Sequence, residues 1–151
     1  MIVRGARQVG KTWSIERFGR SQFPHVVKID FERHPHLKPL FDGDLSPAGL
    51  LEQLGLFARQ EIRPGETLLF FDEIQACPKA VMALRYFYEE MPELHVIAAG
   101  SLLEFSLAEI SVPVGRVSYL EMFPMTFREY LRATGNEPAA ETVGRKPAAL
   151  P

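Results

Sequence analysis

Short apolar runs alternate along the chain with stretches in which apolar residues recur at helical spacing. The short runs are rich in β-branched and aromatic residues, as strands are, and lie at 2–3, 25–31, 67–71, 95–99 and 117–120. The helical patterns cover 11–18, 47–58, 78–91, 102–109 and 126–135. This alternation predicts an α/β fold with a mainly parallel five-stranded sheet and helices on both faces.

Individual residues mark where several of these elements begin and end. Ser46 and Pro47 suit the cap and first position of a helix, and Thr126 with Glu129 forms a capping box before the last one. Gly19 is expected to end the first helix. The run 67–71 is apolar without alternation, which predicts a central strand buried on both faces.

Residues 5–12 read Gly-Ala-Arg-Gln-Val-Gly-Lys-Thr, which is the phosphate-loop pattern G-x-x-x-x-G-K-T. The glycines let backbone N–H groups curl around phosphate oxygens, and the following helix N-terminus favours an anion. Lys11 would reach the β- and γ-phosphates, and the Thr12 hydroxyl would hold Mg²⁺. The predicted nucleotide-binding residues are Gly5, Ala6, Arg7, Gln8, Val9, Gly10, Lys11, Thr12 and Trp13.

Two carboxylates, Asp72 and Glu73, directly follow the apolar run 68–71. Asp72, at the end of a buried strand, can hold Mg²⁺ through water, and Glu73 can polarise a water for attack on the γ-phosphate. A solvated acidic turn would explain the pair alone. The phosphate loop upstream, which we expect on the neighbouring strand, favours the Walker B interpretation.

Glu73 also helps to separate classes of nucleotide enzyme. The sole asparagine is Asn136, so the Asn-Lys-x-Asp guanine motif of Ras-type GTPases is absent from the sequence. Small-molecule P-loop kinases need no water-activating glutamate. The acidic pair therefore favours hydrolysis of ATP with Mg²⁺ as the cofactor.

Trp13 follows the Lys-Thr pair, where many phosphate loops carry a second Ser or Thr. At about 100° per residue, Ile15 and Phe18 are expected to face the core, so Trp13 points nearly the opposite way. The indole either packs beneath another segment or flanks the sugar or base of the nucleotide.

Composition sets the class of protein. The chain has 151 residues, of which 46% are hydrophobic, enough for one domain with a core. A formal net charge of −2 gives no indication of nucleic-acid binding, and no apolar run has the length of a membrane span. Cys77 is alone, which excludes a disulfide framework within the chain. We expect a cytoplasmic protein.

The two ends differ from the middle of the chain. Only Met1 to Arg4 precede the loop, and the stretch 136–151 is rich in Pro and Ala. We expect an ATPase core over 1–135, shortened at its N-terminus, and a flexible tail or linker over 136–151.

Four runs resemble a prokaryotic family of AAA-type P-loop ATPases: RGARQVGKT, FFDEIQ, AAGSLLEFSLAE and PVGRVSYLEMFPMTFREYL. The resemblance implies a three-layer αβα P-loop NTPase core. It also implies a helical lid and a C-terminal domain of unassigned function after the core, and we expect this chain to lack both.

The resemblance assigns two further residues. Ser101 falls at the sensor position that touches the γ-phosphate or orients the attacking water, although a helix-capping Ser fits equally well. Arg116 falls where an arginine finger would act in a neighbouring subunit, which implies a homo-oligomer; an ordinary surface Arg is the alternative. No protein partner is indicated.

Two functions fit these features. The first is an ATPase core that binds ATP or ADP and hydrolyses ATP with Mg²⁺, using Lys11, Asp72 and Glu73. The alternative is a nucleotide-gated protein-interaction module with little or no hydrolysis.

Overall fold

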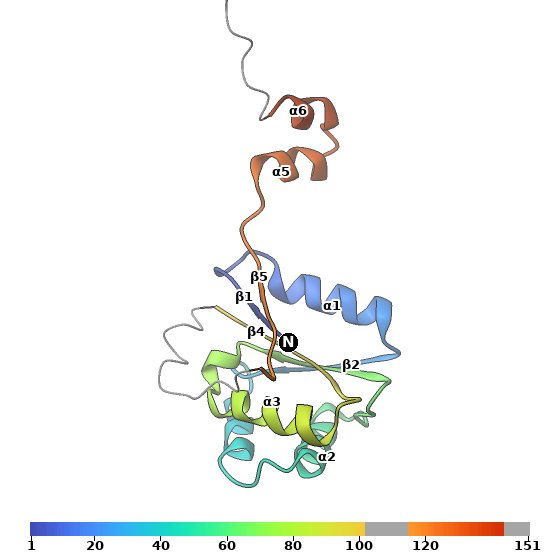
Figure 1. Cartoon of the computed structure of the whole chain (residues 1–151), viewed down its shortest axis with the longest axis vertical. Coiled ribbons are helices and arrows are strands. Elements are labelled where there is room, and N and C mark those ends of the chain that lie inside the picture. The colour runs from blue at the N-terminus through green and yellow to red at the C-terminus, as the bar shows by residue number, and fades with distance from the viewer. Residues whose placement is uncertain (102–114, 144–151) are drawn as a thin grey trace, which may run out of the picture.

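The computed structural model describes residues 1–101 and 115–143 (Figure 1). A parallel sheet has the strand order β2-β3-β4-β1-β5. Its strands are β1 (Ile2–Arg4), β2 (His25–Asp30), β3 (Thr67–Asp72), β4 (His95–Gly100) and β5 (Tyr119–Glu121). The predicted α/β class and parallel sheet are confirmed, whereas the helix expected over 102–109 lies outside the described residues.

Helices cover both faces of the sheet, which gives three layers (Figure 1). Helix α1 (Lys11–Gln22) lies on one face, while α2 (Pro47–Ala58) and α3 (Lys79–Glu90) lie on the other. Along the chain, the 3₁₀ helix η1 (Pro35–Phe41) precedes α2, and a second one, η2 (Ile74–Ala76), precedes α3. Beyond β5, α5 (Phe127–Ala133) and α6 (Glu137–Thr142) pack on each other and stand apart from the sheet. Helix α6 falls within the stretch for which a tail is expected.

Strand β3 is buried along its whole length, as its unbroken apolar run predicts. Leu68 and Phe70 join the smaller apolar cluster beneath α1, which also contains Ile15. Leu69 and Phe71 join the larger cluster on the α2 and α3 side. The alternation of side chains along a strand therefore lets this one segment supply both cores.

Phe71 is the centre of an aromatic group in the larger core. Its ring centroid lies 5.4 Å from that of Phe31, 5.8 Å from that of Phe41 and 6.3 Å from that of Phe87. Phe31 and Phe41 come from the connection between β2 and β3, Phe87 comes from α3 between β3 and β4, and each of these rings is fully buried. Such edge-on and tilted packing adds to the stabilisation from apolar burial.

The prediction that Gly19 ends the first helix is wrong. Helix α1 continues to Gln22, and Gly19 is buried within it. A Cβ at Gly19 would lie 2.8 Å from a methyl of Val26 and 2.9 Å from a methyl of Leu68. The glycine therefore permits close packing of the helix on β2 and β3. In the sequence, this packing requirement resembles a helix stop signal.

Phe18 was expected to face the core but is 47% exposed and packs edge-on against Phe23, whereas Ile15 is buried as predicted. In α3, Tyr88 is likewise exposed, although the adjacent Phe87 is buried. In both helices the buried face is narrower than the stripe of apolar residues in the sequence, because an aromatic residue at one side of that stripe is exposed.

The predicted helix starts are confirmed. The Ser46 hydroxyl accepts a hydrogen bond from the Gly49 N–H at 3.4 Å, with Pro47 at the first helical position. Thr126 and Glu129 make both hydrogen bonds of the capping box at the start of α5. Local capping chemistry was thus sufficient to locate these two helices.

Replacing Phe71 with Ala should lower the free energy of unfolding by about 3–5 kcal/mol, because the substitution empties the centre of the larger core. The matched control is Phe123→Ala, since that ring is 73% exposed and its loss should change stability by no more than about 0.5 kcal/mol. Chemical denaturation followed by circular dichroism measures both. Equal effects of the two substitutions would contradict the described core.

Candidate functional site

The phosphate-loop residues connect β1 to α1 at the edge where the parallel strands end, the usual position of ligand sites in such sheets. Gln8 and Gly10 adopt left-handed conformations with φ of 65° and 96°. A Cβ at Gly5 would overlap the Met122 carbonyl oxygen just after β5. Gly5 therefore permits close approach to that segment, and Gly10 permits the sharp turn into the helix.

Backbone N–H groups at the start of α1 are not used by the helix. Its first hydrogen bond is donated by the Ser14 N–H to the Gly10 carbonyl at 3.0 Å, which leaves the N–H groups of Lys11, Thr12 and Trp13 without partners inside the helix. A cavity of about 380 Å³ opens here, lined by Arg7, Gln8, Gly10, Lys11, Thr12, Glu32 and Glu73. Free N–H groups and the helix dipole favour an anion at this place.

Lys11 folds back over its own loop. Its Nζ donates hydrogen bonds to the carbonyls of Gly5 at 2.8 Å and Ala6 at 2.7 Å. Burial lowers the pKa of Lys11, while the carboxylates of Glu73 and Asp72 act in the opposite direction. The ammonium thus sits beside the cavity with neutral hydrogen-bond partners and two nearby negative charges.

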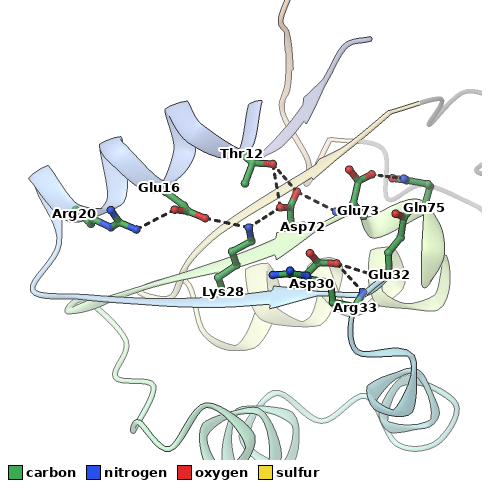
Figure 2. Close-up of polar contacts among 10 residues, drawn as sticks. All are labelled: Thr12, Glu16, Arg20, Lys28, Asp30, Glu32, Arg33, Asp72, Glu73 and Gln75. Atoms are coloured by element: carbon green, nitrogen blue, oxygen red, sulfur yellow. Dashed lines mark hydrogen bonds and ion pairs between the residues drawn. The ribbon is translucent and has the colours of Figure 1, made fainter. Parts of the chain in front are cut away.

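The Asp72 carboxylate is the most enclosed charge of the site, with the residue only 4% exposed. The Thr12 hydroxyl lies 3.1 Å from Oδ1 and 3.0 Å from Oδ2. The backbone N–H of Glu73 donates to Oδ1 at 3.2 Å, and Lys28 Nζ lies 2.9 Å from Oδ2 (Figure 2). These donors compensate the cost of removing the carboxylate from water.

The expectation that the loop and Asp72 lie on neighbouring strands is wrong, because β4 lies between β1 and β3. The two regions still meet, since the first turn of α1 reaches over the sheet and places the Thr12 hydroxyl against Asp72. The intervening strand brings a third group to the same edge, Ser101, which directly follows β4.

Ser101 is buried, with 1% of the residue exposed, and contacts the loop through Arg7. Arg7 Nε donates to the Ser101 hydroxyl at 3.4 Å, and a second guanidinium nitrogen donates to Glu32 at 3.4 Å. Arg7 therefore links the loop to the ends of β4 and β2, and the structure brings Ser101 together with the loop residues.

Glu73 has a left-handed backbone with φ of 50°, a conformation that side-chain-bearing residues rarely adopt. Its carboxylate accepts a hydrogen bond from the Gln75 amide, and the residue lines the cavity (Figure 2). The turn of the backbone separates the directions of two consecutive acidic side chains, so that Asp72 faces Thr12 while Glu73 reaches the cavity.

Arg116 lies away from these groups. It precedes β5, whose residues pair in parallel with β1, so it is at the edge where the strands begin, opposite the loop. Its Nε lies 2.6 Å from the Glu89 carboxylate on α3, and this hydrogen bond lowers the pKa of Glu89. The structure does not bring Arg116 to the site of its own chain.

Trp13 points away from the sheet, as its helical position predicts, and is 65% exposed. The Arg17 guanidinium lies 5.3 Å from the centroid of its ring. The indole and this guanidinium, one turn apart on α1, form a cation–π contact on the exposed side of the helix.

Sequence reasoning missed Lys28, which the structure places between Asp72 and Glu16. Burial acts to lower the pKa of Lys28, but its hydrogen bonds to Asp72 and Glu16 outweigh that effect, so the pKa is raised. A signal was present, since Lys28 is a cation in the middle of the predicted strand 25–31, where charge is unusual.

The two histidines before α2, His34 and His36, pack on an aromatic ring. Among residues 1–101 and 115–143, no three His, Cys, Asp or Glu side chains are grouped as metal ligands. The rings of His34 and His36 pack against Phe57, with centroids 4.9 Å and 5.6 Å away.

Within residues 1–101 and 115–143, no helix has the length and apolar character needed to span a membrane.

A parallel sheet, a phosphate-type loop after β1 and a buried acidic residue at the end of β3 together define the class of P-loop NTPase cores. The profile of a family described as an AAA domain matches residues 1–131, most of the 151 residues, so the chain belongs to this family. The resemblance to AAA-type P-loop ATPases is thereby confirmed, and the family indicates nucleotide binding of the ATPase type. A search among curated proteins found no match.

Replacing Thr12 with Val should lower the free energy of unfolding of the nucleotide-free protein by about 1–2 kcal/mol, because Asp72 loses a hydrogen bond while staying buried. Thr12→Ser keeps the hydroxyl and should retain most of that stability. Thermal or urea unfolding measures both. If the two variants were destabilised equally, the hydroxyl would not be the group that stabilises Asp72.

Proposed function

We propose that residues 1–135 form an ATPase core that binds ATP with Mg²⁺ and hydrolyses it to ADP and phosphate. The observation that carries this proposal is the meeting of the Thr12 hydroxyl and the Asp72 carboxylate at about 3.0 Å beside the loop. A carboxylate buried at the end of an apolar strand and held by a hydroxyl is costly for stability. Its position beside the loop therefore supports a role in ligand binding.

In this proposal, residues 5–13 bind the polyphosphate mainly through backbone N–H groups. The Lys11 ammonium exchanges its hydrogen bonds to the Gly5 and Ala6 carbonyls for stronger, charge-assisted ones to the β- and γ-phosphates. Trp13 flanks the ribose or base from the outer side of α1, a position supported by its exposure next to the loop.

The residues present suit a magnesium ion. Mg²⁺ prefers oxygen ligands and retains several of its waters. The Thr12 oxygen would bind it directly and Asp72 through a bound water, and the ion would supply positive charge to the phosphate oxygens. Because Thr12 donates its proton to Asp72, its lone pairs stay available on the opposite side.

Glu73 is proposed as the residue that orients and deprotonates the attacking water. Its carboxylate lines the cavity, and the Gln75 amide holds it there by a hydrogen bond. A carboxylate fixed at one oxygen can accept a water proton at the other. Ser101, bound to Arg7, is placed to contact the γ-phosphate as the sensor residue.

Arg116 is proposed to act only between subunits. It lies at the opposite edge of the sheet from the loop, so it reaches no phosphate of its own chain. As an arginine finger it would leave Glu89 and enter the site of a neighbouring copy in a homo-oligomer.

Replacing Lys11 with Ala should weaken ATP binding by at least about 100-fold, because it removes a charge-assisted contact with the phosphates. Isothermal titration calorimetry of the purified protein measures the affinity. Lys79→Ala is the matched control, because Lys79 pairs with Asp42 on the α3 side of the sheet. This variant should bind ATP as tightly as the wild type does. Unchanged affinity in Lys11→Ala would contradict the proposed binding site.

Glu73→Gln should retain ATP binding and lower the rate of phosphate release by about 10²–10⁴-fold, the range for loss of a general base. The substitution keeps the shape of the side chain and removes its basicity. A coupled phosphate-release assay measures the rate, with calorimetry as the control for binding. Equal turnover of both proteins would exclude Glu73 as the base. A wild type that binds ATP without releasing phosphate would instead support the nucleotide-gated interaction module.

A further inference from the structure

Lys28 joins two carboxylates that come from different layers of the fold. It lies on β2, faces α1, and its Nζ is 2.9 Å from Asp72 Oδ2 and 3.0 Å from Glu16 Oε1 (Figure 2). The ammonium also lies 5.6 Å from the centroid of the Phe70 ring, which forms the floor beneath it. The side chain is about one-third exposed, so this cation is neither free in solvent nor sealed in the core.

Three groups donate to the Asp72 carboxylate, and Lys28 is the only charged one among those that the structure describes. A carboxylate offers about four acceptor positions. The Thr12 hydroxyl approaches both oxygens, the Glu73 N–H approaches Oδ1, and Lys28 approaches Oδ2. The single Thr12 proton is shared between the two oxygens, so the three donors use about three of these positions, and a metal-bound water that approaches Oδ2 competes there with the Lys28 ammonium.

Two of these donors can keep their hydrogen bonds to Asp72 when a metal binds. The Glu73 N–H belongs to the backbone next to Asp72, and the Thr12 hydroxyl can donate to Asp72 while its lone pairs face a metal. Lys28 carries a positive charge, which a divalent cation at Asp72 repels. It also has a second acceptor within hydrogen-bond distance, Glu16, so that it can leave Asp72 without losing all of its compensation.

We propose that Lys28 is a built-in counter-ion of Asp72 that a divalent cation displaces, and that Glu16 then holds the ammonium. Lys28 is thus a positioning residue that tunes the metal affinity of the site. In the metal-free protein it keeps a buried carboxylate paired, and on metal binding it moves along a path already spanned by its two partners. This inference rests on the proposed function, because it requires Asp72 to hold the metal.

The arrangement predicts opposite effects for the two partners of Lys28. Lys28→Met keeps the length of the side chain and removes the charge, so the metal no longer competes with an ammonium. Glu16→Gln removes the second acceptor charge, so the ammonium should remain on Asp72 and oppose the metal more strongly. A merely structural role for Lys28 would make both substitutions act in the same direction.

The test uses Mn²⁺ as the probe, because its binding to the full chain with a non-hydrolysable ATP analogue is read directly by electron paramagnetic resonance. Lys28→Met should bind Mn²⁺ at least about fivefold more tightly than the wild type, the lower end of typical coupling between two ligands. Glu16→Gln should bind it more weakly by a similar factor. Lys79→Met, a lysine that pairs with Asp42 outside the site, is the control and should match the wild type.

A second measurement, thermal unfolding without metal or nucleotide, should show a lower midpoint for Lys28→Met than for Lys79→Met, because Asp72 loses its counter-ion. If Lys28→Met does not fold, Lys28→Gln replaces it and the prediction for Glu16→Gln stands unchanged. Mn²⁺ affinity that is equal or weaker in the charge-removing variant would overturn the inference.

Titration of the analogue in EDTA separates this inference from the proposed function. Analogue binding in EDTA with unchanged Mn²⁺ affinity across all variants would overturn the role of Lys28 alone. A wild type that binds neither the analogue nor Mn²⁺ would contradict the proposed nucleotide site, and the role of Lys28 with it.

Discussion

The organisation of this site depends on one buried carboxylate. Asp72 ends β3, which is buried along its whole length, and its charge can remain there only if donors replace the water that it loses. The donors come from α1 through Thr12, from β2 through Lys28 and from the next residue's backbone. Compensation of a single charge therefore fixes the relative positions of a helix and two strands.

The same requirement explains the close packing on the α1 side of the sheet. Thr12 can reach Asp72 across the intervening strand β4 only if α1 lies close to the sheet. Gly19 permits this, because any side chain there would collide with Val26 and Leu68. Gly5 does the same for the loop against the segment that contains Met122. Small residues thus bring the polar groups within hydrogen-bond distance.

Much of the fold could be predicted because its signals are local. The alternation of strands and helices, the capping residues Ser46 and Thr126, and the loop motif each depend on a few consecutive residues. The misses concern contacts between distant segments. Nothing in the sequence around Gly19 indicates that β2 and β3 pack against it, and the order of strands in the sheet does not follow from the order of motifs along the chain.

The site was predictable in the same uneven way. The spacing of the motifs identified Lys11, Thr12, Asp72 and Glu73, and the structure brings these four residues together. Lys28 was visible in the sequence only as a charge in a strand, and its contact with Asp72 required the register that sets Asp30 opposite Asp72. Arg116 was assigned from resemblance alone, and the structure pairs it with Glu89 at the opposite edge of the sheet.

The central claim is that the loop between β1 and α1 binds the phosphates of ATP through its backbone. Hydrogen–deuterium exchange of the N–H groups over residues 5–13, measured with and without saturating ATP and Mg²⁺, tests it most directly. The account predicts strong protection of these N–H groups on nucleotide addition, with little change in α2. Nucleotide binding without protection of this segment would show that ATP binds elsewhere and would contradict the account.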